Sequence, residues 1–171
     1  MHYMDTNKRL DKNNYYLNIA KHVSNRSTCL RRHYGCVIVN NDEIISTGYN
    51  GSPRGMINCI DNPNGCLRNQ LNIPRGTNYN LCRSCHSEAN AIISSDRKSM
   101  IGSSLYLCGI EVSTGEYVKN AMPCSICTKL ILNSGIESVY IADSESSYRH
   151  YSVFDWREDN SFLEKLIIDG Y

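Results

Sequence analysis

His86-Ser87-Glu88 and Pro123-Cys124-Ser125-Ile126-Cys127 are the two segments that decide how this chain folds and reacts. One histidine and two cysteines offer the nitrogen and sulfur ligands that zinc prefers, and three such ligands leave one tetrahedral position open. Water in that position has a pKa of about 7, so hydroxide is available at neutral pH. Glu88 is not a ligand and is free to transfer protons. The pattern predicts a hydrolytic zinc site with ligands His86, Cys124 and Cys127 and with Glu88 as the catalytic residue.

Neither segment is specific by itself. A histidine and a glutamate two residues apart are common on exposed helices, and Cys124-x-x-Cys127 equally suits half of a structural zinc site or a redox pair. Their combination is far more specific, because each segment opens a predicted helix after a loop or strand.

Composition describes an ordinary globular chain of 171 residues, 41% of them hydrophobic and 20% charged. This length predicts one domain, residues 1–171. The net charge of +1 argues against a nucleic-acid partner, which usually requires a basic excess. No apolar run is long enough to span a membrane, so we expect a cytoplasmic protein. The nine cysteines are then better explained as metal ligands and buried apolar residues than as disulfides.

Periodicity predicts alternating helices and strands with one long irregular segment. The expected helices are 11–24, 86–95, 123–134 and 161–168, and the expected strands are 36–39, 43–49, 104–108 and 137–142. This order indicates a mixed sheet covered by helices. Right-handed crossovers place the helices that begin at His86 and Pro123 side by side, so that their N-termini converge on one metal.

Further motifs add specificity, namely Cys36-Val37-Ile38-Val39 after Gly35 and Thr47-Gly48-Tyr49-Asn50-Gly51-Ser52-Pro53-Arg54-Gly55. With the zinc motifs, they make the chain resemble the cytidine and deoxycytidylate deaminase family over about residues 15–148. The resemblance implies an α/β fold, a three-layer α/β/α cytidine-deaminase-like arrangement with a central mixed sheet of four to five strands. It places a cysteine-bearing zinc loop at about residues 50–85.

The resemblance also implies an activity, the zinc-dependent hydrolysis of dCMP to dUMP and ammonia in pyrimidine deoxynucleotide metabolism. Hydroxide attacks C4 of cytosine while Glu88 protonates N3 and then the departing amine. Two alternatives remain open. One is a deaminase of another cytosine nucleotide such as dCTP, or of an RNA base. The other is a zinc-stabilised regulatory or interaction module without catalysis, against which the presence of Glu88 argues.

The resemblance further implies which residues bind substrate. Asn50 is expected to bind the sugar. Arg31, Arg32 and Arg54 lie in loops that flank the site in this family, and arginine suits phosphate binding. Tyr148 is expected near the base, whereas Tyr140 lies in an apolar strand and is better explained as core.

A second, structural zinc is implied for the loop at 50–85, which is too poor in apolar residues to hold itself by burial. The expected ligands are Cys29, Cys59, Cys66 and Cys82, with Cys85 a rival for the place of Cys82. Cys36 and Cys108 are expected to be buried packing residues.

The sequence departs from the family in two places. Ser87 stands where alanine is usual, and the strand that normally follows the last crossover helix is missing, very short or drawn from the 150s. Members of the family imply a homo-oligomer, often a hexamer, activated by dCTP with Mg²⁺ and inhibited by dTTP. Gly51 and Arg97 are the expected regulatory contacts.

Overall fold

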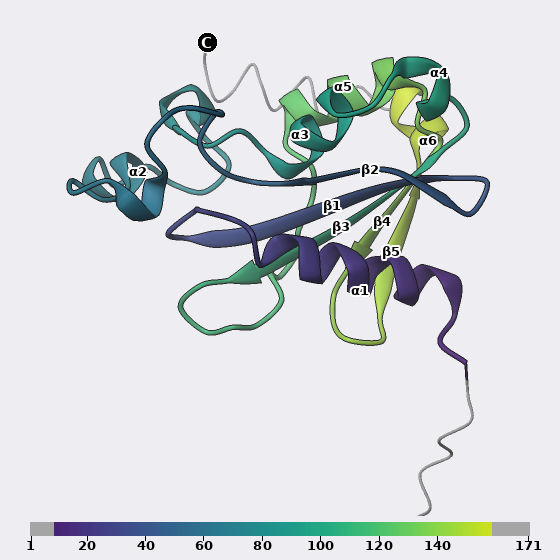
Figure 1. Ribbon diagram of the computed structural model, residues 1–171, viewed down its shortest axis with the longest axis horizontal. Coiled ribbons are helices and arrows are strands. Elements are labelled where there is room, and N and C mark those ends of the chain that lie inside the picture. The colour runs from purple at the N-terminus through teal and green to yellow at the C-terminus, as the bar shows by residue number, and fades with distance from the viewer. Residues whose placement is uncertain (1–8, 159–171) are drawn as a thin grey trace, which may run out of the picture.

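A five-stranded mixed sheet organises the protein in the computed structural model, which describes residues 9–158 (Figure 1). The strands are β1 Arg32–Asn40, β2 Glu43–Tyr49, β3 Ser104–Glu111, β4 Ser138–Ala142 and β5 Tyr148–Ser152, and they lie in the order β2-β1-β3-β4-β5. Only β3 and β4 are parallel; the other neighbours are antiparallel. The mixed sheet predicted from the sequence is therefore confirmed, with five strands.

Helices cover both faces of this sheet (Figure 1). Helix α1, Lys12–Ser24, lies on one face, and on the other lie α3 Ser87–Ile93, α4 Arg97–Met100, α5 Ser125–Ser134 and α6 Val153–Glu158. Helix α2, Leu67–Gln70, and the 3-10 turns Cys59–Asp61 and Tyr79–Leu81 belong to the long segment between β2 and α3. The three-layer α/β/α arrangement is thus as expected. No helix among residues 9–158 combines the length and the apolar character needed to cross a membrane.

Two apolar cores result, one on each face of the sheet. Alternation along β1 directs Cys36 and Ile38 to one core and Val37 and Val39 to the other. The larger core joins β1, β3 and β4 to α3 and α5, and the smaller one joins them to α1. Cys108 is fully buried in the smaller core, so both predicted packing cysteines are confirmed.

Two glycines let helices approach the sheet closely. A Cβ on Gly35 would lie 1.9 Å from the Ala20 carbonyl oxygen of α1. A Cβ on Gly48 would lie 2.3 Å from the Ser87 carbonyl oxygen and 2.4 Å from the Ala91 nitrogen of α3. Since backbone atoms cannot rotate away, these positions require glycine, and Gly48 determines how deeply α3 sits.

Several boundaries differ from the predicted ones. Residues 32–34 were expected in a loop but pair with 109–111, which lengthens both β1 and β3. The segment 143–160, for which no element was predicted, contains β5 and α6, so the fifth strand is short and pairs with β4. The predicted helix 161–168 lies outside the described residues.

Candidate active site

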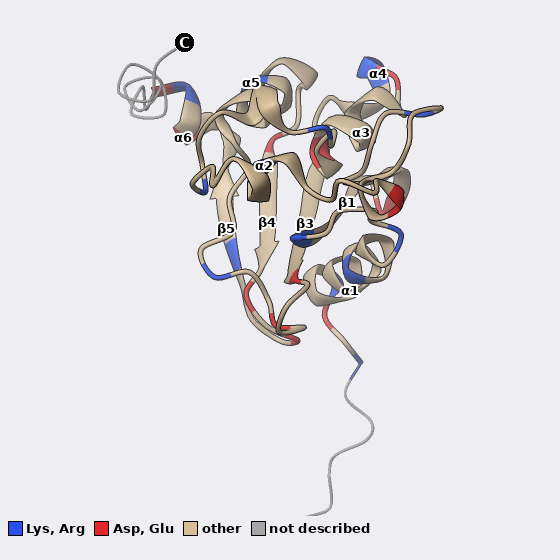
Figure 2. Ribbon diagram, turned by 90° about the vertical axis from the view of Figure 1, so that its left-hand side faces the viewer, with Lys and Arg blue, Asp and Glu red and all other residues tan. Residues whose placement is uncertain are grey.

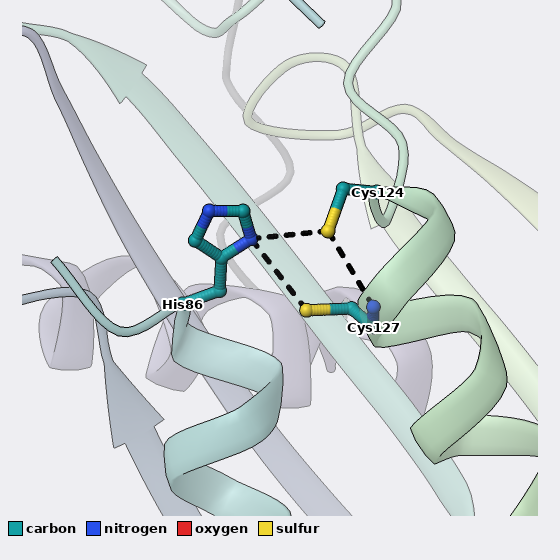
Figure 3. Close-up of side chains that lie close together, drawn as sticks. All are labelled: His86, Cys124 and Cys127. Atoms are coloured by element: carbon teal, nitrogen blue, oxygen red, sulfur yellow. Dashed lines mark hydrogen bonds between the residues drawn. The ribbon is translucent and has the colours of Figure 1, made fainter. Parts of the chain in front are cut away.

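The N-terminal ends of α3 and α5 bring the predicted zinc ligands together (Figure 3). His86 is the residue preceding α3, and Cys124 is the N-cap of α5. The Cys127 backbone N–H donates to Cys124 Sγ at 3.4 Å, which fixes the first turn of α5. The i to i+3 spacing of the two cysteines then places both sulfurs on the side of α5 that faces His86.

The geometry of these side chains fits zinc. His86 Nδ1 lies 3.3 Å from Cys124 Sγ and 3.5 Å from Cys127 Sγ. Nitrogen and sulfur ligands of a tetrahedral zinc at normal bond lengths are about 3.6 Å apart. Between residues 9 and 158 no other group of three His, Cys, Asp or Glu side chains has its ligand atoms all within 4.8 Å of one another. The structure therefore brings together the three side chains that the sequence predicted as zinc ligands.

The charges at the site also favour a metal. A hydrogen bond from the Cys127 thiol, with His86 adding to it, lowers the pKa of Cys124 to about 4 and raises the pKa of Cys127. The lowered pKa favours the thiolate form of Cys124, which is the form that binds a metal.

Glu88 lies beside this triad and is only 4% exposed. Burial raises the pKa of its carboxyl group, although His86 and a hydrogen bond from Ser87 oppose that rise. A carboxylate whose pKa is raised exchanges protons more readily near neutral pH. Glu88 thus has the position and the environment of a proton shuttle.

An open cavity of about 790 Å³, which includes the solvent at its mouth, leads to the triad. The cavity is lined by His86, Glu88 and Cys124 and by residues from the segments around 29–34, Asn50 and 68–84. The long segment before α3 therefore forms one wall of the cavity above the metal ligands.

Asn50 lines this cavity with its side-chain amide held from three sides. Its Oδ1 accepts from Ser27 Oγ at 2.6 Å and from the Tyr34 backbone N–H at 2.7 Å, and its Nδ2 donates to the Arg32 carbonyl at 2.9 Å. The oxygen is then fully used, while one N–H of the amide is left. Asn50 can offer a ligand a hydrogen-bond donor.

Of the three predicted arginines, two line the cavity and one does not. Arg31 and Arg32 line the cavity, and Arg32 Nε also pairs with Glu111 at 2.7 Å. Arg54 is exposed and does not line it. Segments of both charge signs are interspersed along the described chain, without one continuous basic face in this view (Figure 2).

The structure corrects the placement of Tyr148. It lies in the smaller core on the α1 face, where Asn13 Nδ2 donates to its hydroxyl at 2.9 Å, and it does not line the cavity. Its position on β5, which the sequence did not reveal, determines that face. Tyr140 packs between Tyr106 and His150, as expected of a core residue.

The two predicted regulatory residues lie outside the cavity. Gly51 forms a two-way backbone bridge with Cys85. Arg97 begins α4, and its Nε donates to the Asn133 carbonyl at 3.1 Å. Their role remains a prediction.

The second set of cysteines is only partly gathered. Burial raises the pKa of Cys82, and the charges of Cys29 and Cys59 add to that rise. Cys66 is the residue preceding α2. No three of these four sulfurs lie within 4.8 Å of one another.

Several residues that line the cavity were not predicted: Tyr34, Arg68, Arg75 and Tyr79. Three of them lie in the irregular segment, where no periodicity relates sequence to position. Burial raises the pKa of the fourth, Tyr34, to about 12, so its hydroxyl remains neutral. The only sequence feature that could have indicated these residues is an arginine among neutral polar residues. That feature is equally typical of an arginine exposed on the surface.

The chain matches a known protein family. The model of the cytidine and deoxycytidylate deaminase zinc-binding region matches residues 10–143. This range contains the triad, Glu88, Asn50 and the whole irregular segment.

Individual relatives agree with this match. A deoxycytidylate deaminase of Mycobacterium phage D29 is 36% identical over 135 residues, which cover 77% of this chain and 94% of the relative. A deoxycytidylate deaminase of Schizosaccharomyces pombe is 31% identical over 136 residues, 80% of this chain but only 38% of the relative. This chain thus spans well under half of that yeast protein.

Solved structures show a similar fold. The apo dCMP deaminase of cyanophage S-TIM5 superposes with a TM-score of 0.54 at 26% identity, covering 80% of this chain and 86% of that one. The same phage enzyme in complex with dCMP and dUMP gives 0.52 at 28% identity, covering 74% and 77%.

Proposed function

Because the chain belongs to the cytidine and deoxycytidylate deaminase family, we propose that it hydrolyses dCMP to dUMP and ammonia and so serves pyrimidine deoxynucleotide metabolism. One observation carries this proposal: His86 and Cys124 of the triad line an open cavity together with the buried Glu88. Two deoxycytidylate deaminases with 31% and 36% identity support the choice of substrate.

Zinc, when bound to the triad, supplies a Lewis acid and an activated water. Glu88 then does the proton work. Its carboxylate accepts a proton from the attacking water, delivers it to N3 of cytosine and assists the departure of the C4 amine as ammonia. The water oxygen becomes the carbonyl oxygen of uracil, so dCMP and water give dUMP and ammonia. Burial of Glu88 keeps bulk water from competing for these protons.

The cavity walls provide the remaining contacts of the proposed substrate. The free N–H of Asn50 donates to an oxygen of the deoxyribose. Arg31 and Arg32 are the proposed phosphate ligands, and Arg31 has the freer guanidinium because Arg32 pairs with Glu111. Tyr148 does not contact the proposed substrate, since it lies on the opposite face of the sheet.

Activity measurements test the proposal directly. Ammonia release from dCMP, dCTP, CMP and deoxycytidine is followed for the wild type and for Glu88→Ala, with the exposed Glu116→Ala as control. We expect dCMP to be preferred, and Glu88→Ala to lose about 10²- to 10⁴-fold in rate while it retains zinc. Preference for dCTP would favour the first alternative. Absence of activity on all four substrates with zinc bound would favour the non-catalytic module.

We also propose a second, structural zinc held by the cysteines of the loop. The electrostatic influence of Cys29 and Cys59 on Cys82 supports it, and the loop must draw the four sulfurs closer together to bind one ion. Zinc measured per chain in the purified protein tests this: two equivalents are expected, and one equivalent refutes it.

The proposed enzyme is also oligomeric and regulated. We propose a cytoplasmic homo-oligomer, a hexamer, that is activated by dCTP with Mg²⁺ and inhibited by dTTP through Gly51 and Arg97. The deamination rate measured during a titration with each nucleotide tests the regulation. A rate that changes with neither dCTP nor dTTP refutes it. Light scattering gives the mass of the assembly.

A further inference from the structure

Arg68 is a buried arginine in the wall of the cavity. Arg68 is only 5% exposed, although it belongs to the short helix α2 in an otherwise irregular segment. Its Nη1 donates to the Asn78 carbonyl at 2.9 Å and its Nη2 to the Pro74 carbonyl at 2.8 Å. These two bonds hold the guanidinium in one orientation and use two of its five N–H groups.

No carboxylate among residues 9–158 neutralises this charge. The ion pairs of the described chain use other cations: Lys12, Lys21, Arg32 and Arg149. A buried charge without a counter-ion is costly, because carbonyl dipoles satisfy its hydrogen bonds but carry no net charge. The arrangement therefore favours an anion that enters from the cavity.

Arg68 is linked to the triad through the ring of Tyr79. Its guanidinium carbon lies 5.3 Å from the ring centroid of Tyr79, and that ring packs edge-on against the ring of His86 at 5.0 Å. A single aromatic ring thus separates the guanidinium from a zinc ligand, and both ends of this arrangement line the same cavity. A ligand with a base at the zinc and an anionic group one sugar away would reach both.

We propose that Arg68 binds the 5′-phosphate of the nucleotide and so makes the site select a monophosphate over the bare nucleoside. This inference rests on the proposed function. Arg68 suits the task better than the other arginines of the cavity. Arg32 is paired with Glu111, and Arg75 is exposed and donates to the Lys119 and Asn120 carbonyls. Arg31 is only partly buried and its guanidinium makes no hydrogen bond among residues 9–158, so it is not held in one orientation and would add to the contact that Arg68 makes. Only Arg68 is both buried and already held in one orientation, with N–H groups left to bind two oxygens of a phosphate.

Binding of the product and its phosphate-free counterpart tests this without turnover. The dissociation constants of dUMP and deoxyuridine are measured by calorimetry for the wild type, Arg68→Met and Arg68→Lys. We expect Arg68→Met to weaken dUMP by about 30-fold or more, as for the loss of a buried charge partner, and deoxyuridine by less than threefold. Arg68→Lys, which keeps the charge, should recover part of the dUMP affinity.

The matched control is Arg54→Met, since Arg54 is exposed in the same segment and does not line the cavity. It should leave both affinities unchanged. If Arg68→Met weakens dUMP and deoxyuridine equally, Arg68 only holds the loop and the inference is overturned. If neither affinity changes, it is overturned as well.

A structure of the wild type with dUMP decides the matter even if both variants fail to fold. A phosphate oxygen within hydrogen-bond distance of Arg68 supports the inference, and a phosphate held elsewhere overturns it. Failure of the proposed function looks different, since the wild type would then not deaminate dCMP. If dCMP is deaminated but the ratio of the two affinities is insensitive to Arg68, the function stands and only this inference fails.

Discussion

Ser87 and Glu88 share a hydrogen bond inside the protein. Ser87 Oγ donates to Glu88 Oε2 at 2.8 Å, and both side chains are buried. The bond restrains the carboxylate and leaves its other oxygen for the water and the substrate. The serine, which stands where alanine is usual in the family, thus has a definite contact in this chain.

Replacing Ser87 with alanine should lower kcat about tenfold with little change in KM. Loss of a hydrogen bond to a charged group costs about 1.5 kcal/mol, and the orientation of Glu88 matters in the reaction more than in binding. Steady-state kinetics on dCMP measures both constants. The exposed Ser94→Ala is the control, and an unchanged kcat in Ser87→Ala would mean that the bond only satisfies a buried hydroxyl.

Replacing Cys127 with serine should remove zinc, because a hydroxyl is a poor substitute for a buried thiolate. Affinity should fall by more than the about 10- to 100-fold that follows removal of a residue merely bonded to a ligand. Metal analysis after dialysis measures this. Glu88→Ala is the internal comparison, since it should be inactive with its zinc retained. Full zinc occupancy in Cys127→Ser would remove Cys127 from the ligand set.

At the level of single residues, the sequence predicted the zinc ligands but not the residues that form the walls of the cavity. His86, Cys124 and Cys127 were predictable because their spacing follows directly from ligand requirements and helix periodicity. Arg68 and Tyr79 were not, because their positions depend on how an irregular segment folds back over the site.

The contact between β2 and α3 determines where His86 and Glu88 lie. Gly48 allows the backbones to touch, Ser46 Oγ donates to the Ala91 carbonyl at 2.7 Å, and Asn90 Nδ2 donates to the Tyr49 carbonyl at 2.8 Å. The helix is thus tied to the strand by polar bonds as well as by apolar packing.

Gly48→Ala should therefore both destabilise the protein and reduce its activity. The new Cβ would meet backbone atoms of Ser87 and Ala91, so α3 must move outward, at a cost of about 1–3 kcal/mol typical of overpacking. Denaturant unfolding measures the stability and the dCMP assay the activity. The exposed neighbour Thr47→Ala is the control, and wild-type values for Gly48→Ala would show that α3 can shift without consequence.

Elements with a clear period were predictable and those at the edge of the sheet were not. The apolar faces of α1 and α5 repeat as helices require, and Asp11 caps α1 as expected through a bond from the Asn14 N–H at 3.1 Å. Strand β5 has the polar and aromatic sequence Tyr-Arg-His-Tyr-Ser, and none of its residues is fully buried. Its pairing with β4 depends on tertiary contact rather than on pattern.

The molecule as a whole combines a well-packed layered core with a wall that has little core of its own. Of the apolar side chains in residues 50–85, only Cys59 and Ile73 are buried. Arg68 contributes bonds to two carbonyls of this wall. The sequence predicted this contrast, because the segment lacks any period and is poor in apolar residues.

Removal of metal should therefore affect the wall before the core. We expect chelator-treated protein to be cut by trypsin within residues 50–85 much faster than the untreated protein, since few buried contacts oppose local opening. Mass spectrometry of the early fragments locates the cuts, and Arg26 next to α1 is an internal reference. Equal rates with and without metal would show that the wall is held by its own bonds.

The three hydrogen bonds on Asn50 have a consequence for the chemical ageing of the protein. Asparagine before glycine is prone to cyclise and lose its amide, because glycine does not hinder the approach of its nitrogen. In Asn50-Gly51 the amide is restrained and the Gly51 N–H donates to the Cys85 carbonyl at 3.1 Å. The side chain of Asn64, before Gly65, is exposed and makes no hydrogen bond among residues 9–158. Spontaneous amide loss should thus begin on the outer wall and spare the residue that faces the substrate.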